Sequence, residues 1–217
     1  MDRRSAPWVL LCFVALAGCG AAAPRVVEIA DGALPIAPGS RLYFESADPR
    51  SPHELTVAIV GTGSSLTYEL ACGHVEPARA LASPSSGVVS STTLATGRDV
   101  YAIDRCDRRT VHEDSALPAF LVSMRALTAL DHHERTVLRV ENHGSAVALT
   151  PVGHETLSVR VDGQATPIDT IHARGDGMDL WIADVGTPIV VRELDHERGF
   201  ALAGIDTAAA AAPRARR

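Results

Sequence analysis

The feature that most constrains the fold is a period-two alternation of apolar and polar residues, clearest in ETLSVRVDG (155–163). In this stretch Leu157, Val159 and Val161 alternate with polar residues, and the dipeptide Asp162-Gly163 follows as a turn signal. Successive side chains of a β-strand point to opposite faces, so the pattern predicts a strand with one buried face and one wet face.

Similar short runs recur along most of the chain, separated by Gly, Pro, Asp and Asn residues. This cadence is typical of antiparallel sheets. It predicts a mainly β fold, with an antiparallel sheet curled as a sandwich or half-barrel. The other predicted strands are residues 41–46, 54–61, 65–71, 87–94, 99–103, 135–141, 179–184 and 188–194.

One stretch departs from the strand pattern. In SMRALTAL (123–130), Met124, Leu127 and Leu130 stand at helical spacing, and Ser123 precedes them as an N-cap residue. The sequence therefore predicts one short helix, packed against the sheet.

The start of the chain predicts a targeting signal. The apolar run PWVLLCFVAL (7–16) follows a short basic start and is too short to cross a bilayer as a helix. The motif LAGC (16–19) that ends it resembles the lipobox of bacterial lipoproteins. An ordinary buried helix or strand at this end is the alternative interpretation.

The lipobox resemblance implies a chemistry for Cys19. Its thiol would carry diacylglycerol, and the signal peptide, residues 1–18, would be cut off immediately before it. Several acyl chains together anchor a protein stably in a membrane. Gly20 stands where an aspartate would resemble the inner-membrane retention signal, so the expected location is the outer membrane, facing the periplasm.

Composition excludes several classes of function. All basic residues are arginine, which excludes mechanisms that need a lysine Schiff base. The formal net charge is −6, and removing residues 1–18 takes away two arginines and one aspartate, leaving a mature chain near −7. Such a balance argues against a nucleic-acid partner, because nucleic-acid binding needs a basic face.

The remaining cysteines predict a disulfide. Cys12 leaves with the signal peptide and Cys19 is the lipidation site, so Cys72 and Cys106 form an even pair in an oxidising compartment. A metal or redox pair is the alternative, although no CxxC motif is present.

The sequence predicts one β-rich domain over 34–206, preceded by a lipidated cysteine and spacer (19–33) and followed by a disordered tail (207–217). A second resemblance concerns this domain. The opening LPIAPGSRLYF (34–44) and the segments 153–173 and 179–194 are similar to β-rich bacterial periplasmic proteins of unknown function. The resemblance implies a sheet curled into a half-barrel, somewhat like lipoprotein carriers. Trp181 stands on a strand of alternating pattern, which predicts a place in the core.

Histidine-glutamate dipeptides are the anomaly of the sequence. Five of nine histidines precede a glutamate, and His132, His133 and His154 are the candidate metal ligands among them and their neighbours. Adjacent residues of a strand point to opposite faces, so such a dipeptide does not chelate by itself. No HExxH motif is present, and we expect no metal or other cofactor.

The known sequence motifs for nucleophilic catalysis are incomplete or missing in this sequence. VGTGSS (60–65) is similar to the DTGSS motif of aspartic proteases, but Gly61 replaces the essential aspartate and Asp206 is a poor second carboxylate. No G-x-S-x-G elbow is present. We therefore expect no catalytic residues and a protein that is not an enzyme.

Three hypotheses remain. The first is a lipid-anchored domain that binds an apolar ligand or an envelope component. The second is a structural or interaction lipoprotein without a cavity. The third is a metal-binding or hydrolytic protein that uses histidine and glutamate. The expected partners are membrane lipid through acylated Cys19, and an apolar ligand or an envelope protein.

Overall fold

The computed structural model describes residues 36–46, 53–74, 85–101, 116–140, 146–183, 188–195 and 198–208. The helices are α1 (Ser91–Thr96) and α2 (Met124–Asp131). The strands are β1 (Arg41–Ser46), β2 (His53–Gly61), β3 (Ser65–His74), β4 (Ser85–Ser90), β5 (Asp99–Tyr101), β6 (Ala116–Pro118), β7 (Thr136–Val140), β8 (Ala146–Val161), β9 (Gln164–Gly175), β10 (Met178–Ala183), β11 (Val190–Asp195) and β12 (Arg198–Asp206).

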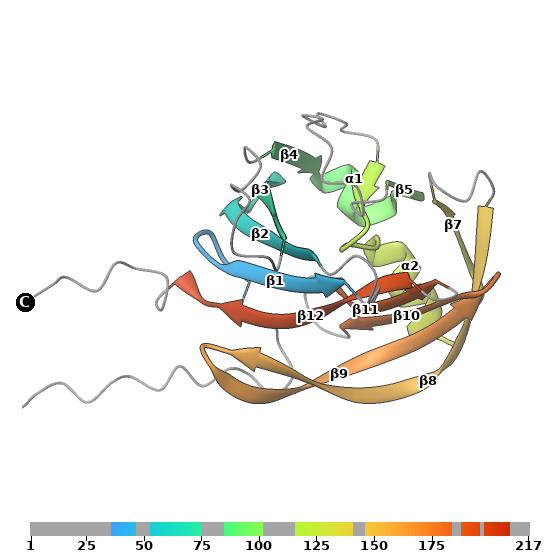
Figure 1. The fold of residues 1–217 in the computed structure, drawn as a ribbon. Coiled ribbons are helices and arrows are strands. Elements are labelled where there is room, and N and C mark those ends of the chain that lie inside the picture. Colours follow the sequence, from blue (N-terminus) through green and yellow to red (C-terminus); the bar gives the residue numbers. More distant parts are fainter. Residues whose placement is uncertain are drawn as a thin grey trace, which may run out of the picture.

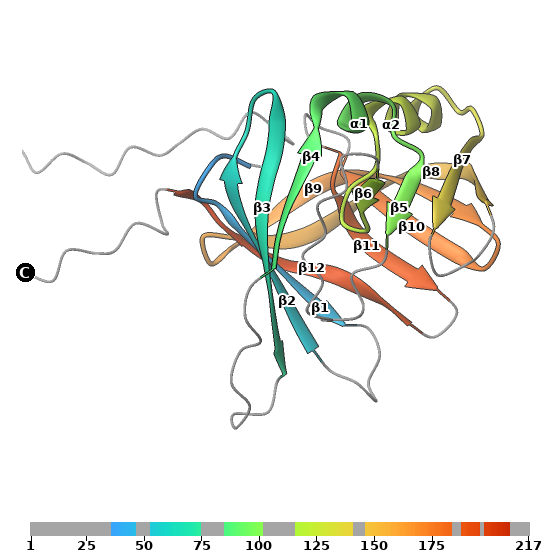
Figure 2. The same cartoon turned by 90° about the horizontal axis from the view of Figure 1, so that it is seen from above.

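The strands form one 12-stranded sheet in the order β4-β3-β2-β1-β12-β11-β10-β9-β8-β7-β5-β6. Pairing is antiparallel except where β5 meets β6 and β7, and where β12 meets β8. Figures 1 and 2 show that the sheet is strongly curled and that the two helices lie side by side. The predicted mainly β fold, a curled sheet with a short helix, is confirmed.

The long strand β8 pairs with two antiparallel neighbours, one after the other along its length. Its first four residues pair with β7, and residues from Thr150 onward pair with β9. At the far end the β8–β9 hairpin turns at Asp162-Gly163, the predicted turn, where both residues have positive φ (51° and 83°). Positive φ at both central positions is the requirement of the tight hairpin turn that matches strand twist.

Five strands close into a ring, because β12 pairs with β8 as well as with β11. Gly204 lies opposite Arg160 and Ile205 opposite Val161 in this parallel contact. The backbone and hydroxyl of Thr207 both donate to the Asp162 carboxylate, each at 2.8 Å, and so fasten the end of β12 to the hairpin turn. Thr207 was predicted to begin the tail; residues 209–217 lie outside the described residues.

The inside of the curl is filled by the protein's own side chains. The segment from β6 to Ser123, the N-cap of α2, is buried throughout, and Phe120 lies near its centre. Its ring contacts those of Phe44 and Tyr68 on one side, at 6.1 and 5.3 Å between centroids. On the other side its carbonyl accepts a hydrogen bond from the backbone of Val190. This segment therefore joins the two halves of the sheet through one core.

The predicted helix is confirmed as α2. The Ser123 hydroxyl accepts a hydrogen bond from the backbone of Ala126, and Leu127 and Leu130 are buried. This is the N-cap geometry that the sequence indicated. None of the described helices is long and apolar enough to span a membrane.

A second helix was not predicted. Residues 87–94 were expected to form one strand, but β4 ends at Ser90 and α1 follows. The Ser90 side chain accepts a hydrogen bond from the backbone of Thr93, and the Gly97 backbone donates to the Thr93 carbonyl. Local capping thus outweighs the strand preference of the two threonines.

Candidate functional site

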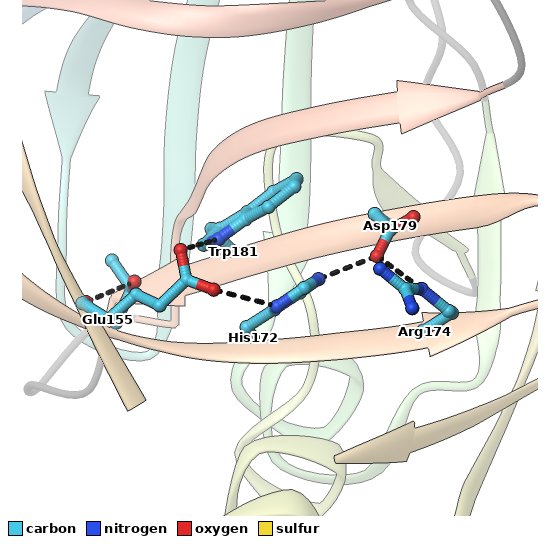
Figure 3. Close-up of polar contacts among 6 residues, drawn as sticks. Glu155, His172, Arg174, Asp179 and Trp181 are labelled. Atoms are coloured by element: carbon cyan, nitrogen blue, oxygen red, sulfur yellow. Dashed lines mark hydrogen bonds and ion pairs between the residues drawn. The ribbon is translucent and has the colours of Figure 1, made fainter. Parts of the chain in front are cut away.

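A row of polar and aromatic side chains crosses four neighbouring strands of the ring. Figure 3 shows most of this row in place. We name it the polar ladder; its members are Glu155 of β8, His172 and Arg174 of β9, Asp179 and Trp181 of β10, and Arg192 of β11.

Strand register puts these side chains on one face. His172 lies directly opposite Trp181, and Trp181 lies directly opposite Arg192 on its other side. Arg174 lies opposite Asp179 in the same hairpin. Residues opposite one another in a ladder share a face, so the three strands present one continuous row.

The other face of the same strands belongs to the hydrophobic core. Ile171, Ala173, Leu180 and Ile182 alternate with the ladder residues and are all buried. The ladder is therefore backed by a packed layer, and its strands cannot slip by one residue without exposing that layer.

His172 is the centre of the ladder. Its Nδ1 lies 2.9 Å from Glu155 Oε1, and its Nε2 lies 2.6 Å from Asp179 Oδ1. The imidazole side chain is only 6% exposed. One buried ring thus contacts two carboxylates that come from the strands on either side of it.

Trp181 is enclosed between two potential cations. The His172 ring is stacked on the indole at 4.3 Å between centroids and 10° between planes. The guanidinium of Arg192 lies 4.9 Å from the indole centroid. Because these residues flank Trp181 on opposite strands, both indole faces are covered, and the ring offers no open face for stacking a sugar or base.

The indole nitrogen has a fixed role. Trp181 Nε1 donates to Glu155 Oε2 at 2.8 Å. Glu155 is therefore held by two contacts, one from each aromatic ring. The Thr170 hydroxyl also donates to the Glu155 carbonyl, at 2.6 Å.

Asp179 is held as an anion. Its burial opposes ionisation, but hydrogen bonds from His172 and Arg174, reinforced by their charges, hold the pKa of this carboxyl below its ordinary value. Arg174 Nε donates to the same oxygen as His172, at 2.8 Å.

Exposure increases along β9 from one end of the ladder to the other. Ile168, Thr170 and His172 alternate on one face and are buried, whereas the Arg174 side chain is 61% exposed. Glu155 on the neighbouring strand is 48% exposed. The ladder therefore has a buried aromatic centre and a charged rim in contact with solvent.

The ladder places a buried imidazole between two carboxylates, and the described residues put no nucleophile beside that imidazole. Both hydrogen-bond partners of His172 in the described part of the chain are carboxylates. A triad needs a hydroxyl or thiol on one ring nitrogen and an orienting acid on the other. Here both nitrogens are occupied by acids.

The candidate metal ligands do not converge. His132 caps the C-terminal end of α2, His133 follows it with a positive φ of 59°, and His154 lies on β8; all three are exposed. Among the described residues, no three His, Cys, Asp or Glu side chains lie close enough together to hold a metal ion.

Two further predicted sites lie wholly or partly outside the described residues. Cys19 belongs to a segment that the structure does not describe, and so does Cys106. Cys72 lies on β3, opposite Leu55 of β2. Lipidation of Cys19 and the Cys72–Cys106 disulfide therefore stay predictions.

Sequence reasoning missed the ladder, although part of the signal was present. Asp176-Gly177 is a two-residue hairpin turn, and counting outward from it places Arg174 opposite Asp179 and His172 opposite Trp181. Trp181 is buried, as expected, but beside charged groups. Glu155 was noted only as the neighbour of His154, which lies opposite Ile171.

The chain matches no protein-family model, no curated protein and no solved structure.

Proposed function

We propose that this protein is a lipid-anchored component of the bacterial cell envelope that binds another envelope component through its surface and has no catalytic centre. The anchor is Cys19, proposed from the LAGC motif (16–19) behind a short apolar run. The motif and Gly20 favour the outer membrane, facing the periplasm.

The observation that carries a surface role is the filled curl of the sheet. A carrier of apolar molecules needs an open cavity with an apolar lining. Here Phe120 and Leu121 occupy the inside of the curl and are almost completely buried. This supports the interaction hypothesis over the apolar-ligand hypothesis.

The charged rim of the polar ladder is the proposed contact surface. Glu155 and Arg174 are exposed, yet each is held by a more buried partner, Trp181 and Asp179 respectively. Charges held in place before binding lose little side-chain entropy on binding, which favours recognition of a polar partner.

Site-specific photo-crosslinking in the native envelope tests this proposal. A photoreactive residue at Thr150, which is exposed and opposite Arg174, should give one discrete adduct. The same residue at Val60, exposed on β2, is the matched control and should give none. Arg174→Gln should remove the Thr150 adduct and leave the amount of anchored protein unchanged.

Native mass spectrometry of protein released from its own envelope provides the opposing test. The interaction proposal expects the mass of the acylated chain without a further small molecule. A stoichiometric apolar molecule would support the ligand-binding hypothesis instead, and stoichiometric zinc or copper would support the metal-binding one. Absence of any position-specific adduct at Thr150 would contradict the proposed surface.

A further inference from the structure

The hydrogen bonds of His172 imply a particular protonation state. Nδ1 and Nε2 both lie within hydrogen-bond distance of carboxylate oxygens. Ionised carboxylates only accept hydrogen bonds, and an imidazole donates from both nitrogens only when it is an imidazolium. The described geometry therefore belongs to the charged ring.

We propose that His172 is a proton-dependent cross-link between β8 and β10, and that loss of its proton releases Glu155 while Asp179 stays bound. The proton leaves Nδ1 for bulk water on the exposed Glu155 side, and no covalent bond between heavy atoms changes. This inference does not depend on the proposed anchor or on the proposed surface role.

The two arms of the cross-link are unequal. The Nε2–Asp179 contact is 2.6 Å and the Nδ1–Glu155 contact is 2.9 Å. The Asp179 side chain is 22% exposed, and Glu155 is 48% exposed. Asp179 is also ion-paired to Arg174. A neutral ring therefore keeps its hydrogen on Nε2, where the acceptor is less exposed and its charge is fixed.

Deprotonation then places two lone pairs face to face. Without its hydrogen, Nδ1 confronts Glu155 Oε1, which carries a negative charge. Water can solvate Glu155 if its side chain turns outward, because the residue lies at the rim. This rotation of the Glu155 side chain also removes the acceptor of the Trp181 indole N–H, so the indole signal reports the loss of the proton from His172.

Charged groups on the neighbouring strands set the balance between the charged and neutral forms of His172. Glu155 of β8 and Asp179 of β10 favour the imidazolium. Arg174 on the same strand and Arg192 of β11, which lies beyond Trp181, oppose it. The imidazolium is thus flanked by two anions in direct contact and two cations at a further remove.

Trp181 makes the proposal measurable. The chain has two tryptophans, and Trp8→Phe in the full-length protein leaves Trp181 as the single indole. We expect the Trp181 Nε1–H resonance and its fluorescence to change in one step of a pH titration, as the His172 imidazole loses its proton. A charged stacked imidazole quenches indole emission, so fluorescence should rise with pH.

Carboxylate footprinting identifies the arm that opens. Carbodiimide labelling of Glu155, normalised to the exposed Glu134, should increase several-fold across the same step, and labelling of Asp179 should stay constant. Equal increases at both carboxylates, or no change at Glu155, would overturn the proposal.

Two variants separate a proton switch from a purely structural contact. His172→Gln should abolish the step in all three readouts. Glu155→Gln should keep the fold and move the step to lower pH, because a glutamine amide can donate to an unprotonated Nδ1. A step that persists in His172→Gln, or stays at the same pH in Glu155→Gln, would contradict the assignment.

Discussion

The rings of His172 and Trp181 lie face to face, 4.3 Å apart and 10° from parallel, on adjacent strands. The indole also donates to Glu155, so one side chain combines a ring stack with a hydrogen bond. Buried aromatic residues contribute strongly to stability, and pairs of rings add to that contribution.

Trp181→Ala should therefore lower the free energy of unfolding by about 3–5 kcal/mol, measured by urea denaturation. Trp181→Phe keeps a ring between His172 and Arg192 but loses the N–H donor and part of the ring volume, so it should cost less, about 1–3 kcal/mol. The control is Val152→Ala, at a side chain that is 55% exposed. A Trp181→Ala protein as stable as this control would refute a stabilising ladder.

The lowered pKa of Asp179 predicts that the stability of the fold depends on pH. Its pKa is lowered in the fold by hydrogen bonds to His172 and Arg174, which outweigh burial, so its contribution to stability is present above the unfolded-state pKa of about 3.9. That contribution disappears as pH falls through the folded-state pKa.

Asp179→Asn should therefore be less stable than the natural protein at neutral pH, by about 1.5–3 kcal/mol, with the gap narrowing in acid. Urea midpoints at pH 7 and in acid measure this gap. Asp131→Asn, at an exposed position on α2, is the control and should show no such convergence. A gap that is the same at both pH values would contradict the assignment.

The N-cap hydrogen bond of α2 predicts a loss of stability when the Ser123 hydroxyl is removed. Ser123→Ala removes the acceptor for the Ala126 backbone, and the site is buried, so the variant should lose about 1 kcal/mol. Thr128→Ala on the exposed side of the same helix should be neutral or slightly stabilising. Thermal unfolding followed by circular dichroism compares the two, and equal effects would argue against capping.

Cys19→Ser should abolish membrane anchoring, because the serine hydroxyl does not replace the thiol that accepts diacylglycerol. Cell fractionation and intact mass measure the outcome. If the variant is still processed at residue 19 and still sediments with membranes, lipidation at this position is wrong. Cys12→Ser, within the predicted signal peptide, is the matched control and should leave anchoring intact.

Cys72 and Cys106 should be disulfide-bonded in the exported protein. Alkylation without reductant should leave both thiols unmodified, and alkylation after reduction should add two labels. The bond would contribute about 3–4 kcal/mol in the chain-entropy account. Two labelled thiols in the folded, unreduced protein would exclude it.

The sequence predicted the fold class because strand alternation and helix capping are local signals. The Leu157–Val161 alternation and the Ser123 cap are both present in the structure. Local signals also misled: β-branched threonines after Ser90 favoured a longer strand, and capping bonds made a helix. β12 was not predicted at all, because glycine and alanine weaken its alternation.

The polar ladder depends on register, which is not a local property. His172 meets Trp181 because the Asp176-Gly177 turn sets the hairpin. Glu155 joins them because the Asp162-Gly163 turn sets the register of β8 on β9 and places Glu155 opposite Thr170, on the face that also carries His172. Both turns are visible in the sequence, whereas nothing in it marks how far β8 and β9 stay in register before the bulge between Pro151 and Gly153.

The sheet cannot be completed until β12, its last strand in the sequence, has paired. This strand lies between β1 and β11 and also pairs with β8. Among the described strands, it is the one through which β1–β4 are hydrogen-bonded to the rest of the sheet. The hydrogen bond from Tyr43 to Asp206 joins residues 163 positions apart. Contacts between such distant residues slow folding. A chain emerging residue by residue would expose two bare sheet edges until β12 arrives, and bare edges invite aggregation. We therefore expect the edges of β1 and β11 to be the aggregation-prone part of a chain in which β12 has not yet paired.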